Sequence, residues 1–239
     1  MHQVKRAIIM AAGLGSRMYP LTAETPKPLV AVHGKPMIET IISALHKNGI
    51  YEIYVVIGHL KEHFYEFQKN HPEIVLLENP YYDTCNNISS LYIARDHLED
   101  SMIIDGDQII PDEHILDPHF AKSGYNAVWT DAHTDEWLLT LENDTVTHCS
   151  RTGGSHGWQL FSISRWTAED GKKLKHHLEL VFTVQKRKDL YWDDIALFCY
   201  PADYDLGVFP MEPGSVMEID SLEELVSIDS SYKKYFVGE

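Results

Sequence analysis

A short loop near the N-terminus carries residue types that bind phosphate. Gly13 and Gly15 follow an apolar run at residues 4–10 that predicts a buried strand, and Arg17 comes two residues later. Loop N–H groups beyond the carboxyl end of a strand can hold a phosphate, and Arg can bind one with two parallel hydrogen bonds. A dinucleotide fingerprint would need glycine in place of Met18, and no phosphate-loop ATPase motif is present. The loop alone favours a plain turn, with an anion site as the alternative.

Two pairs of carboxylates could hold a metal ion. Asp105 and Asp107 come at the end of an expected strand, and Glu218 and Asp220 lie in the pattern Met217-Glu218-Ile219-Asp220-Ser221 at the end of a second one. Residues two apart in a strand point to the same face, so Glu218 and Asp220 can converge on one cation. Mg²⁺ prefers one or two carboxylates together with water and phosphate oxygens. We expect Asp105 to be the spare acid, hydrogen-bonded locally or through water.

An amide and a hydroxyl could read a nucleobase. Asn87 and Ser90 lie in the segment Cys85-Asn86-Asn87-Ile88-Ser89-Ser90-Leu91. Amides offer both donor and acceptor to the edge of a pyrimidine. The alternative is that these side chains only cap the helix that begins here.

Aromatic residues stand next to carboxylates at two places. Glu136 and Trp137 form one pair, and Tyr191, Trp192 and Asp193 form the other. A quaternary ammonium cannot donate hydrogen bonds, so aromatic faces with anionic neighbours would recognise it. The same residues could bind a primary ammonium if the carboxylates contact it directly. The residue types alone do not decide between a quaternary and a primary ammonium.

The remaining chemistry-bearing residues have simpler interpretations. Trp129 and Trp166 are expected in the core, and Trp158 is left open between core and pocket. The fourteen histidines lack metal-ligand spacing and are expected at the surface or in the core. The three cysteines fit neither a zinc site nor a disulfide framework, which favours a reducing, cytoplasmic location.

The apolar periodicity predicts a single α/β domain over residues 1–239. Strands at 4–10, 51–57, 74–77 and 102–104 alternate with helices at 36–48, 60–69 and 87–94, which is typical of a doubly wound, mostly parallel, Rossmann-like sheet. Shorter strands at 127–130, 138–141, 145–149 and 159–163 indicate a small, β-rich, antiparallel insertion or lid, followed by a helix at 167–182. A strand at 216–219 and a capping box of Ser221 and Glu224 end the fold. We expect a nucleotide-binding part at 1–125, an acceptor-binding part at 126–215 and a metal-binding strand with its closing helix at 216–239.

Charge and length exclude several classes of protein. The formal net charge is −16, which argues against general nucleic-acid binding and against a polybasic membrane surface. Residues 1–50 are an exception, with six basic and two acidic side chains. No apolar stretch reaches the ~20 residues of a membrane span, so no membrane insertion is expected.

The longest motif resembles the signature of the sugar-phosphate nucleotidyltransferase superfamily. It runs from Ala11 to Thr22 and continues as Thr25-Pro26-Lys27-Pro28-Leu29. The resemblance implies that the loop wraps a nucleoside triphosphate, that Arg17 contacts the leaving pyrophosphate and that Lys27 neutralises phosphate charge. The implied nucleotide-binding residues are Ala12, Gly13, Gly15, Ser16, Asn87 and Ser90. The implied Mg²⁺ ligands are Asp107, Glu218 and Asp220.

Over nearly the whole chain the sequence is similar to bacterial phosphocholine cytidylyltransferases of cell-surface decoration pathways. That resemblance implies transfer of a cytidylyl group from CTP to phosphocholine, in a cage of Trp137, Tyr191 and Trp192 with Asp193 or Glu136 as the negative charge. 2-Aminoethylphosphonate is the alternative acceptor, and a sugar-1-phosphate is less favoured. A non-catalytic nucleotide sensor is a further alternative, disfavoured by the intact acids and bases. The expected partners are CTP and a phosphorylated amine, with a homodimer as a further possibility.

Overall fold

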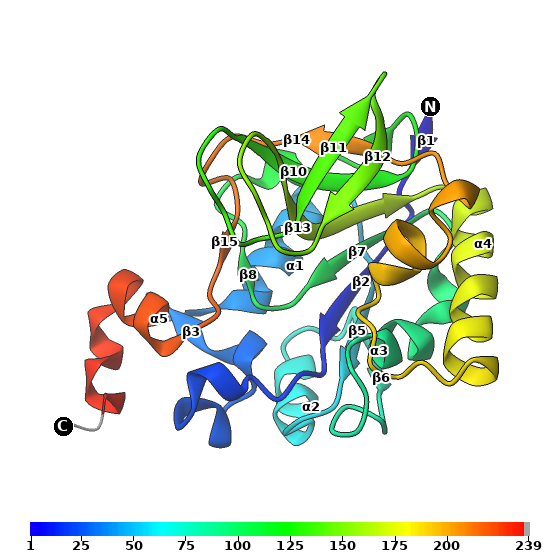
Figure 1. Cartoon of the computed structure of the whole chain (residues 1–239). Coiled ribbons are helices and arrows are strands. Elements are labelled where there is room, and N and C mark those ends of the chain that lie inside the picture. Colours follow the sequence, from blue (N-terminus) through cyan, green and yellow to red (C-terminus); the bar gives the residue numbers. More distant parts are fainter. Residues whose placement is uncertain (237–239) are drawn as a thin grey trace.

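The computed structural model describes residues 1–236, and a nine-stranded sheet forms its centre (Figure 1). Four parallel strands, in the order β7-β2-β5-β6, make the part that holds the glycine loop. Their bounds are Ser101–Asp105 (β7), Arg6–Ala11 (β2), Glu52–Ile57 (β5) and Ile74–Glu78 (β6). Strand β2 thus has β5, the next strand of this sheet in sequence, on one side and the later β7 on the other. This order makes the carboxyl ends of β2 and β7 the topological switch point of the sheet.

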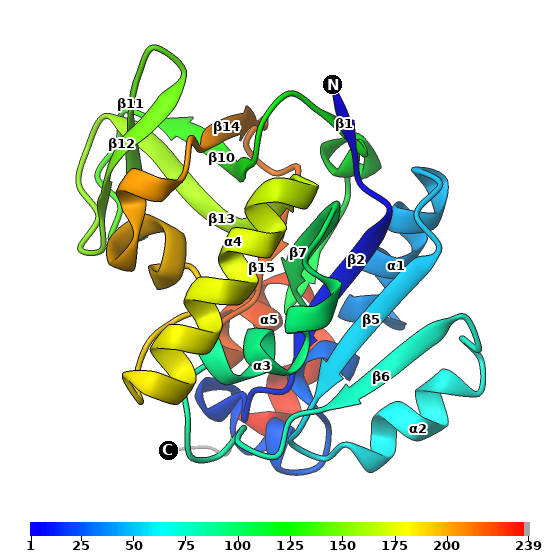
Figure 2. The same ribbon diagram turned by 90° about the vertical axis from the view of Figure 1, so that its right-hand side faces the viewer.

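Helices cover both faces of the parallel strands, as the continuous burial of Ala7–Ala11 in β2 requires. Ile9 packs in one core with helices α1 (Met37–Lys47) and α2 (Glu62–Gln68). Ile8 packs in the other with α3 (Ile88–Ile93) and α4 (Ala168–Glu179). In Figure 2, α3 and α4 lie in front of the sheet and α1 lies behind it. The predicted doubly wound fold is therefore confirmed.

The β-rich segment extends the same sheet. Strand β13 pairs antiparallel with β7, with Ile163 opposite Ile104, and also with β10 and β11. Strand β11 pairs antiparallel with β12, and β14 runs parallel to β10 along the outer edge. The bounds are Gly124–Thr130 (β10), Leu138–Glu142 (β11), Thr145–Ser150 (β12), Gly157–Trp166 (β13) and Gly207–Pro210 (β14).

The C-terminal segment returns to the N-terminal loop. Strand β15 (Met217–Glu218) pairs with β8 (Gln108–Ile109), and the predicted capping box of Ser221 and Glu224 starts α5 (Leu222–Ile228). Ile219 and Leu225 are buried against Met18 and Val30 in a third core. This packing brings the residues around 220 to the loop after β2.

The remaining short strands are β1 (His2–Gln3), β3 (Ala31–Val32), β4 (Lys35–Pro36) and β9 (His119–Phe120). Among the described residues, no helix has the length and apolar character needed to cross a membrane.

Two tryptophans expected in the core have different environments. Trp166 is completely buried, as predicted. The prediction for Trp129 is wrong, because its side chain is 42% exposed and lies edge to face with Trp158 and His156 near the far end of β10. The ring lies beyond the helices that bury the rest of the sheet.

His177 makes the stability of the fold depend on pH. It is buried in α4, stacks on Tyr200 with ring centroids 3.9 Å apart and forms a 2.8 Å hydrogen bond with the Tyr204 hydroxyl. Burial lowers its pKa below the ordinary 6.5, so the unfolded chain takes up a proton first as pH falls. We expect the free energy of unfolding to fall below about pH 6.5 until the folded-state pKa is reached. Urea unfolding of His177→Gln should lack this component, whereas the exposed His176→Gln should retain it. An unchanged pH profile in His177→Gln would contradict the assignment.

Candidate active site

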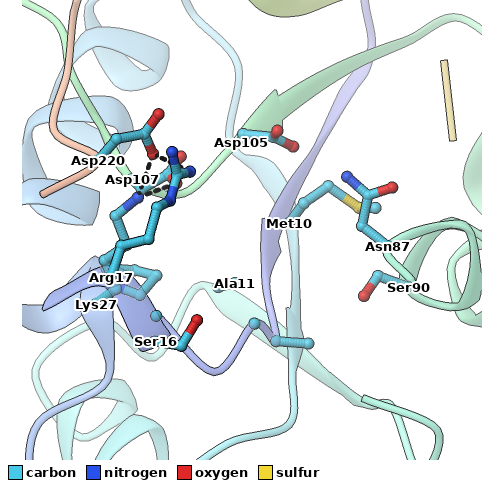
Figure 3. A pocket seen from close by; sticks show the side chains of 14 residues that line it. Met10, Ala11, Ser16, Arg17, Lys27, Asn87, Ser90, Asp105, Asp107 and Asp220 are labelled. Atoms are coloured by element: carbon cyan, nitrogen blue, oxygen red, sulfur yellow. Dashed lines mark hydrogen bonds and ion pairs between the residues drawn. The ribbon is translucent and has the colours of Figure 1, made fainter. Parts of the chain in front are cut away.

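The predicted nucleotide-binding residues line one pocket at the switch point of the sheet. Its volume is about 240 Å³, and it lies between the loop after β2 and the end of β7 (Figure 3). Every residue predicted to contact the nucleotide lines it: Ala12, Gly13, Gly15, Ser16, Arg17, Lys27, Asn87 and Ser90.

The conformation of Gly15 shapes the phosphate loop. Its φ of +63° is in the left-handed region, and an added Cβ would lie 2.9 Å from Thr22 Cγ2 and 3.1 Å from Lys27 Cβ. The Thr22 hydroxyl donates a 2.8 Å hydrogen bond to the Gly15 carbonyl. Glycine at this position therefore lets the loop pack directly on the segment that supplies Lys27.

Lys27 is a buried cation held by two carboxylates. Lys27 is 7% exposed, and its Nζ atom lies 2.6 Å from Asp107 Oδ2 and 2.8 Å from Asp220 Oδ1. Burial alone would lower its pKa, but the charges and hydrogen bonds of Asp107 and Asp220 outweigh this and raise the pKa. Arg17 Nη2 lies 2.7 Å from the same Asp220 oxygen (Figure 3). The two cations predicted to bind phosphate thus form one cluster with Asp107 and Asp220, which are predicted to bind metal.

Three carboxylates could hold a divalent cation in this cluster. Ligand oxygens of Asp107, Glu218 and Asp220 lie within 4.8 Å of one another. Asp107 Oδ1 is buried and has no hydrogen-bond partner among the described residues. Desolvation and the charges of Asp107, Asp220 and Asp105 raise the pKa of Glu218 well above its ordinary value. A hard cation with oxygen ligands would satisfy these groups.

Asp105 lies at the end of β7, and its expected role as the spare acid stays a prediction. Ser162 and Trp192 lie within hydrogen-bonding reach of its carboxyl, while its buried Oδ1 atom has no well-aligned partner among the described residues. Burial, together with the charges of Asp107 and Asp193, raises the pKa of Asp105 well above the usual range. Its carboxyl faces a second pocket, which it also lines.

The second pocket holds most of the predicted acceptor-binding residues. Its volume is about 330 Å³, and it shares Arg17, Asn87, Asp105, Asp107 and Asp220 with the first pocket. Its remaining lining residues are Glu136, Trp137, Leu160, Ser162, Tyr191, Asp193 and Glu218. Six carboxylates and one guanidinium therefore line this space. Such an excess of negative charge favours a cationic ligand.

Two aromatic rings stand in this pocket instead of the three expected. Trp137 and Tyr191 lie edge to face, with centroids 5.8 Å apart at 86°. The expectation that Trp192 joins them is wrong, because Trp192 is completely buried, stacks on Tyr125 at 6.0 Å and lies outside the pocket lining. Tyr191 is 49% exposed. Neighbouring loop residues thus point in opposite directions, and the larger apolar ring fills the core.

Asp193 is the most buried acid of the second pocket. It is 5% exposed, and its Oδ1 atom has no hydrogen-bond partner among the described residues. Burial raises its pKa well above the ordinary value, and the charges of Asp194 and Glu218 add to this effect. A cation that donates a hydrogen bond here would satisfy the free oxygen and stabilise the charged carboxylate.

Asn87 connects the two pockets. Its Oδ1 accepts a 2.9 Å hydrogen bond from the backbone N–H of Trp192, and it makes no capping bond to α3. The amide N–H groups of Asn87 are therefore the donors that it can offer to a ligand. Ser90 Oγ accepts a 3.1 Å hydrogen bond from Asn79 Nδ2. These partners fix both side chains at the border of the first pocket.

Sequence reasoning missed several lining residues. Leu160 and Ser162 project from β13 into the second pocket, and Met10 and Pro28 line the first. Leu160 and Ser162 are two residues apart in β13, so their side chains lie on the same face of the sheet. That spacing predicts that both line the pocket once β13 is placed beside β7. Trp158 lines a separate surface hollow beside Trp129.

Comparisons with known proteins agree with this geometry. Residues 6–138 match the family described as Nucleotidyl transferase. The chain is 40% identical to a 2-aminoethylphosphonate cytidylyltransferase from Lancefieldella rimae over 95% of this chain and 92% of that one. It is 32% identical to a choline-phosphate cytidylyltransferase from Streptococcus pneumoniae over 95% and 98% of the two chains. A solved structure of the CTP:phosphocholine cytidylyltransferase from Streptococcus pneumoniae superimposes with a TM-score of 0.88, covering 96% of this chain and 99% of that one at 32% identity. The chain therefore belongs to the nucleotidyl transferase family, and it is a nucleotidyltransferase whose relatives include cytidylyltransferases.

Proposed function

We propose that this enzyme transfers the cytidylyl group of CTP to 2-aminoethylphosphonate and releases pyrophosphate. The observation that carries the proposal is the pair of joined pockets, one with the phosphate loop and Lys27, the other lined by six carboxylates. The relative from Lancefieldella rimae, with its 40% identity, supports the same acceptor.

The unpaired carboxylate oxygens favour a primary ammonium over a quaternary one. Asp105 and Asp193 each have a buried Oδ1 atom with no well-aligned hydrogen bond among the described residues, although Ser162 and Trp192 lie near the first carboxyl and Tyr125 near the second. A primary ammonium carries three N–H donors, whereas a quaternary ammonium carries none. Leaving buried acceptors unpaired costs about 1–3 kcal/mol each, more for charged groups. An acceptor with a primary ammonium would remove that cost.

Phosphocholine is the second candidate, because aromatic faces are also present. Trp137 and Tyr191 both line the acidic pocket, and each cation–π contact contributes about 0.5–2 kcal/mol. The loss of Trp192 from the cage weakens this alternative.

The proposed reaction needs positioning and charge neutralisation. A phosphonate oxygen, ionised at neutral pH, attacks the α-phosphorus of CTP, and the bond from that phosphorus to the oxygen shared with the β-phosphate breaks, so that this oxygen leaves with pyrophosphate. Arg17 and Lys27 balance the charge that develops on the phosphates, and no general base is required. We propose Asp107, Glu218 and Asp220 as ligands of Mg²⁺, which supplies further charge neutralisation on the triphosphate when bound.

A comparison of acceptors tests the proposed function. Pyrophosphate release is measured with CTP, Mg²⁺ and either 2-aminoethylphosphonate or phosphocholine. We expect kcat/KM to be at least about 10-fold higher for 2-aminoethylphosphonate, because only its primary ammonium has N–H groups that can donate hydrogen bonds to the carboxylates of the pocket. Preference for phosphocholine would instead support the second candidate. Absence of pyrophosphate release with both acceptors would contradict the proposed function.

A further inference from the structure

We propose that Arg151 and Asp194, which lie outside the pocket lining, form a positioning pair that holds the aromatic rings of the acceptor pocket and so sets acceptor affinity. The proposal rests on the proposed function, since it concerns the same acceptor. Both residues stand behind Trp137 and Tyr191, which belong to two different loops.

Arg151 contacts the Trp137 ring at the open end of the hairpin formed by β11 and β12. Leu138 in β11 pairs with Ser150 in β12, so Trp137 and Arg151 are the next residues beyond that pair. The guanidinium carbon of Arg151 lies 5.5 Å from the centroid of the Trp137 ring and 3.9 Å from that of Phe198. Trp137 itself lies edge to face with Phe198, at 5.4 Å and 89°. The guanidinium therefore supports the tryptophan from behind the pocket.

Asp194 fixes the other loop and joins it to the hairpin. Its side chain is 1% exposed and forms an ion pair with Arg151, which is 43% exposed. Asp194 Oδ2 also accepts a 2.9 Å hydrogen bond from the backbone N–H of Tyr191. One buried carboxylate thus connects the backbone of Tyr191 to the cation behind Trp137. Because both rings line the pocket, their mutual geometry depends on this pair.

A second Arg–Asp pair on the same loop provides a matched control. Arg187 and Asp189 form two hydrogen bonds of 2.9 Å, both side chains are more than half exposed, and neither residue lines either pocket. Removing Arg187 deletes one positive charge, as removing Arg151 does, without touching either ring.

Steady-state kinetics of Arg151→Met tests the proposal. We expect the KM for the acceptor to rise about 10-fold, with kcat and the KM for CTP within about threefold of wild type, because the phosphate loop is untouched. Arg187→Met should keep the acceptor KM of wild type.

The double variant Arg151→Met/Asp194→Asn separates positioning from charge balance. Asparagine keeps an acceptor for the Tyr191 N–H and removes the buried charge that Arg151 neutralises. We expect Arg151→Met to lower thermal stability, because Asp194 is left buried without its cation, and the double variant to regain it while the acceptor KM stays high, because Trp137 still lacks its support. An acceptor KM restored to wild type would overturn the proposal, as would an Arg151→Met enzyme with unchanged acceptor KM. Failure of the proposed function gives a different result, since the wild-type enzyme would then transfer nothing to these acceptors.

Discussion

Replacing Lys27 by methionine is expected to lower kcat about 10³-fold, the loss typical of removing one preorganised group that stabilises developing charge. Lys27 is buried beside the phosphate loop, and its Nζ lies within 2.8 Å of both Asp107 and Asp220. Methionine has a similar length and no charge, so the main change is electrostatic. Initial rates of pyrophosphate release from CTP give the measurement.

Lys35→Met is the matched control for Lys27. Lys35 comes from the same basic segment, but its Nζ lies 3.0 Å from the Ser43 hydroxyl, and it lines neither pocket. Its turnover should equal that of wild type. Circular dichroism and thermal unfolding show whether the Lys27 variant is folded. A folded Lys27→Met enzyme that retains more than about a fifth of wild-type kcat would contradict the assigned role.

Asp220→Asn is expected to impair turnover by a similar factor, about 10²- to 10³-fold, and to weaken metal dependence as well. Asp220 accepts hydrogen bonds from both Lys27 and Arg17, and its carboxylate lies in the cluster with Asp107 and Glu218. Asparagine has the same shape as aspartate, but only one of its two terminal atoms is an oxygen that can bind a metal ion. The Mg²⁺ concentration for half-maximal rate should rise at least about 10-fold.

Glu223→Gln provides the control for Asp220. Glu223 is an exposed acid in the first turn of α5, three residues away, and it lines neither pocket. Its half-saturating Mg²⁺ concentration should match that of wild type. If Asp220→Asn and Glu223→Gln showed the same metal dependence, Asp220 could not be a metal ligand.

Local motifs made the nucleotide side of the site predictable. The loop at Gly13 follows a strand whose apolar run is evident in sequence, and the sheet order places the end of β7 beside it. Glu218 and Asp220 were predicted from their spacing and from the family resemblance, and the pairing of β15 with β8 brings them near Asp107. These inferences needed only short-range patterns, that resemblance and one topological rule.

The acceptor side was less predictable because it is assembled from loops. Tyr191 and Trp192 are adjacent in sequence, and nothing in their types indicates which ring points into the pocket and which is buried on Tyr125. Arg151 and Asp194 are 43 residues apart and follow no periodic pattern. Their contact depends on tertiary packing that the sequence pattern does not encode.

Some of the acidic residues behind the net negative charge lie together in the structure. Although the chain carries a net charge of −16, its phosphate loop lies in the basic first fifty residues. Six of its carboxylates converge on the acceptor pocket, where burial raises the pKa of Asp105 and Asp193. Six acidic groups are therefore concentrated where a cationic acceptor would bind, and such a cation would favour their charged form.

Phosphorus NMR of the reaction products tests the central claim most directly. Wild-type enzyme is incubated with CTP, Mg²⁺ and 2-aminoethylphosphonate until one substrate is consumed. Attack at the α-phosphorus predicts coupled signals of a phosphonate–phosphate anhydride in the nucleotide product, with one pyrophosphate for each CTP consumed. Formation of CDP, or the absence of the coupled phosphonate signal, would contradict cytidylyl transfer to this acceptor.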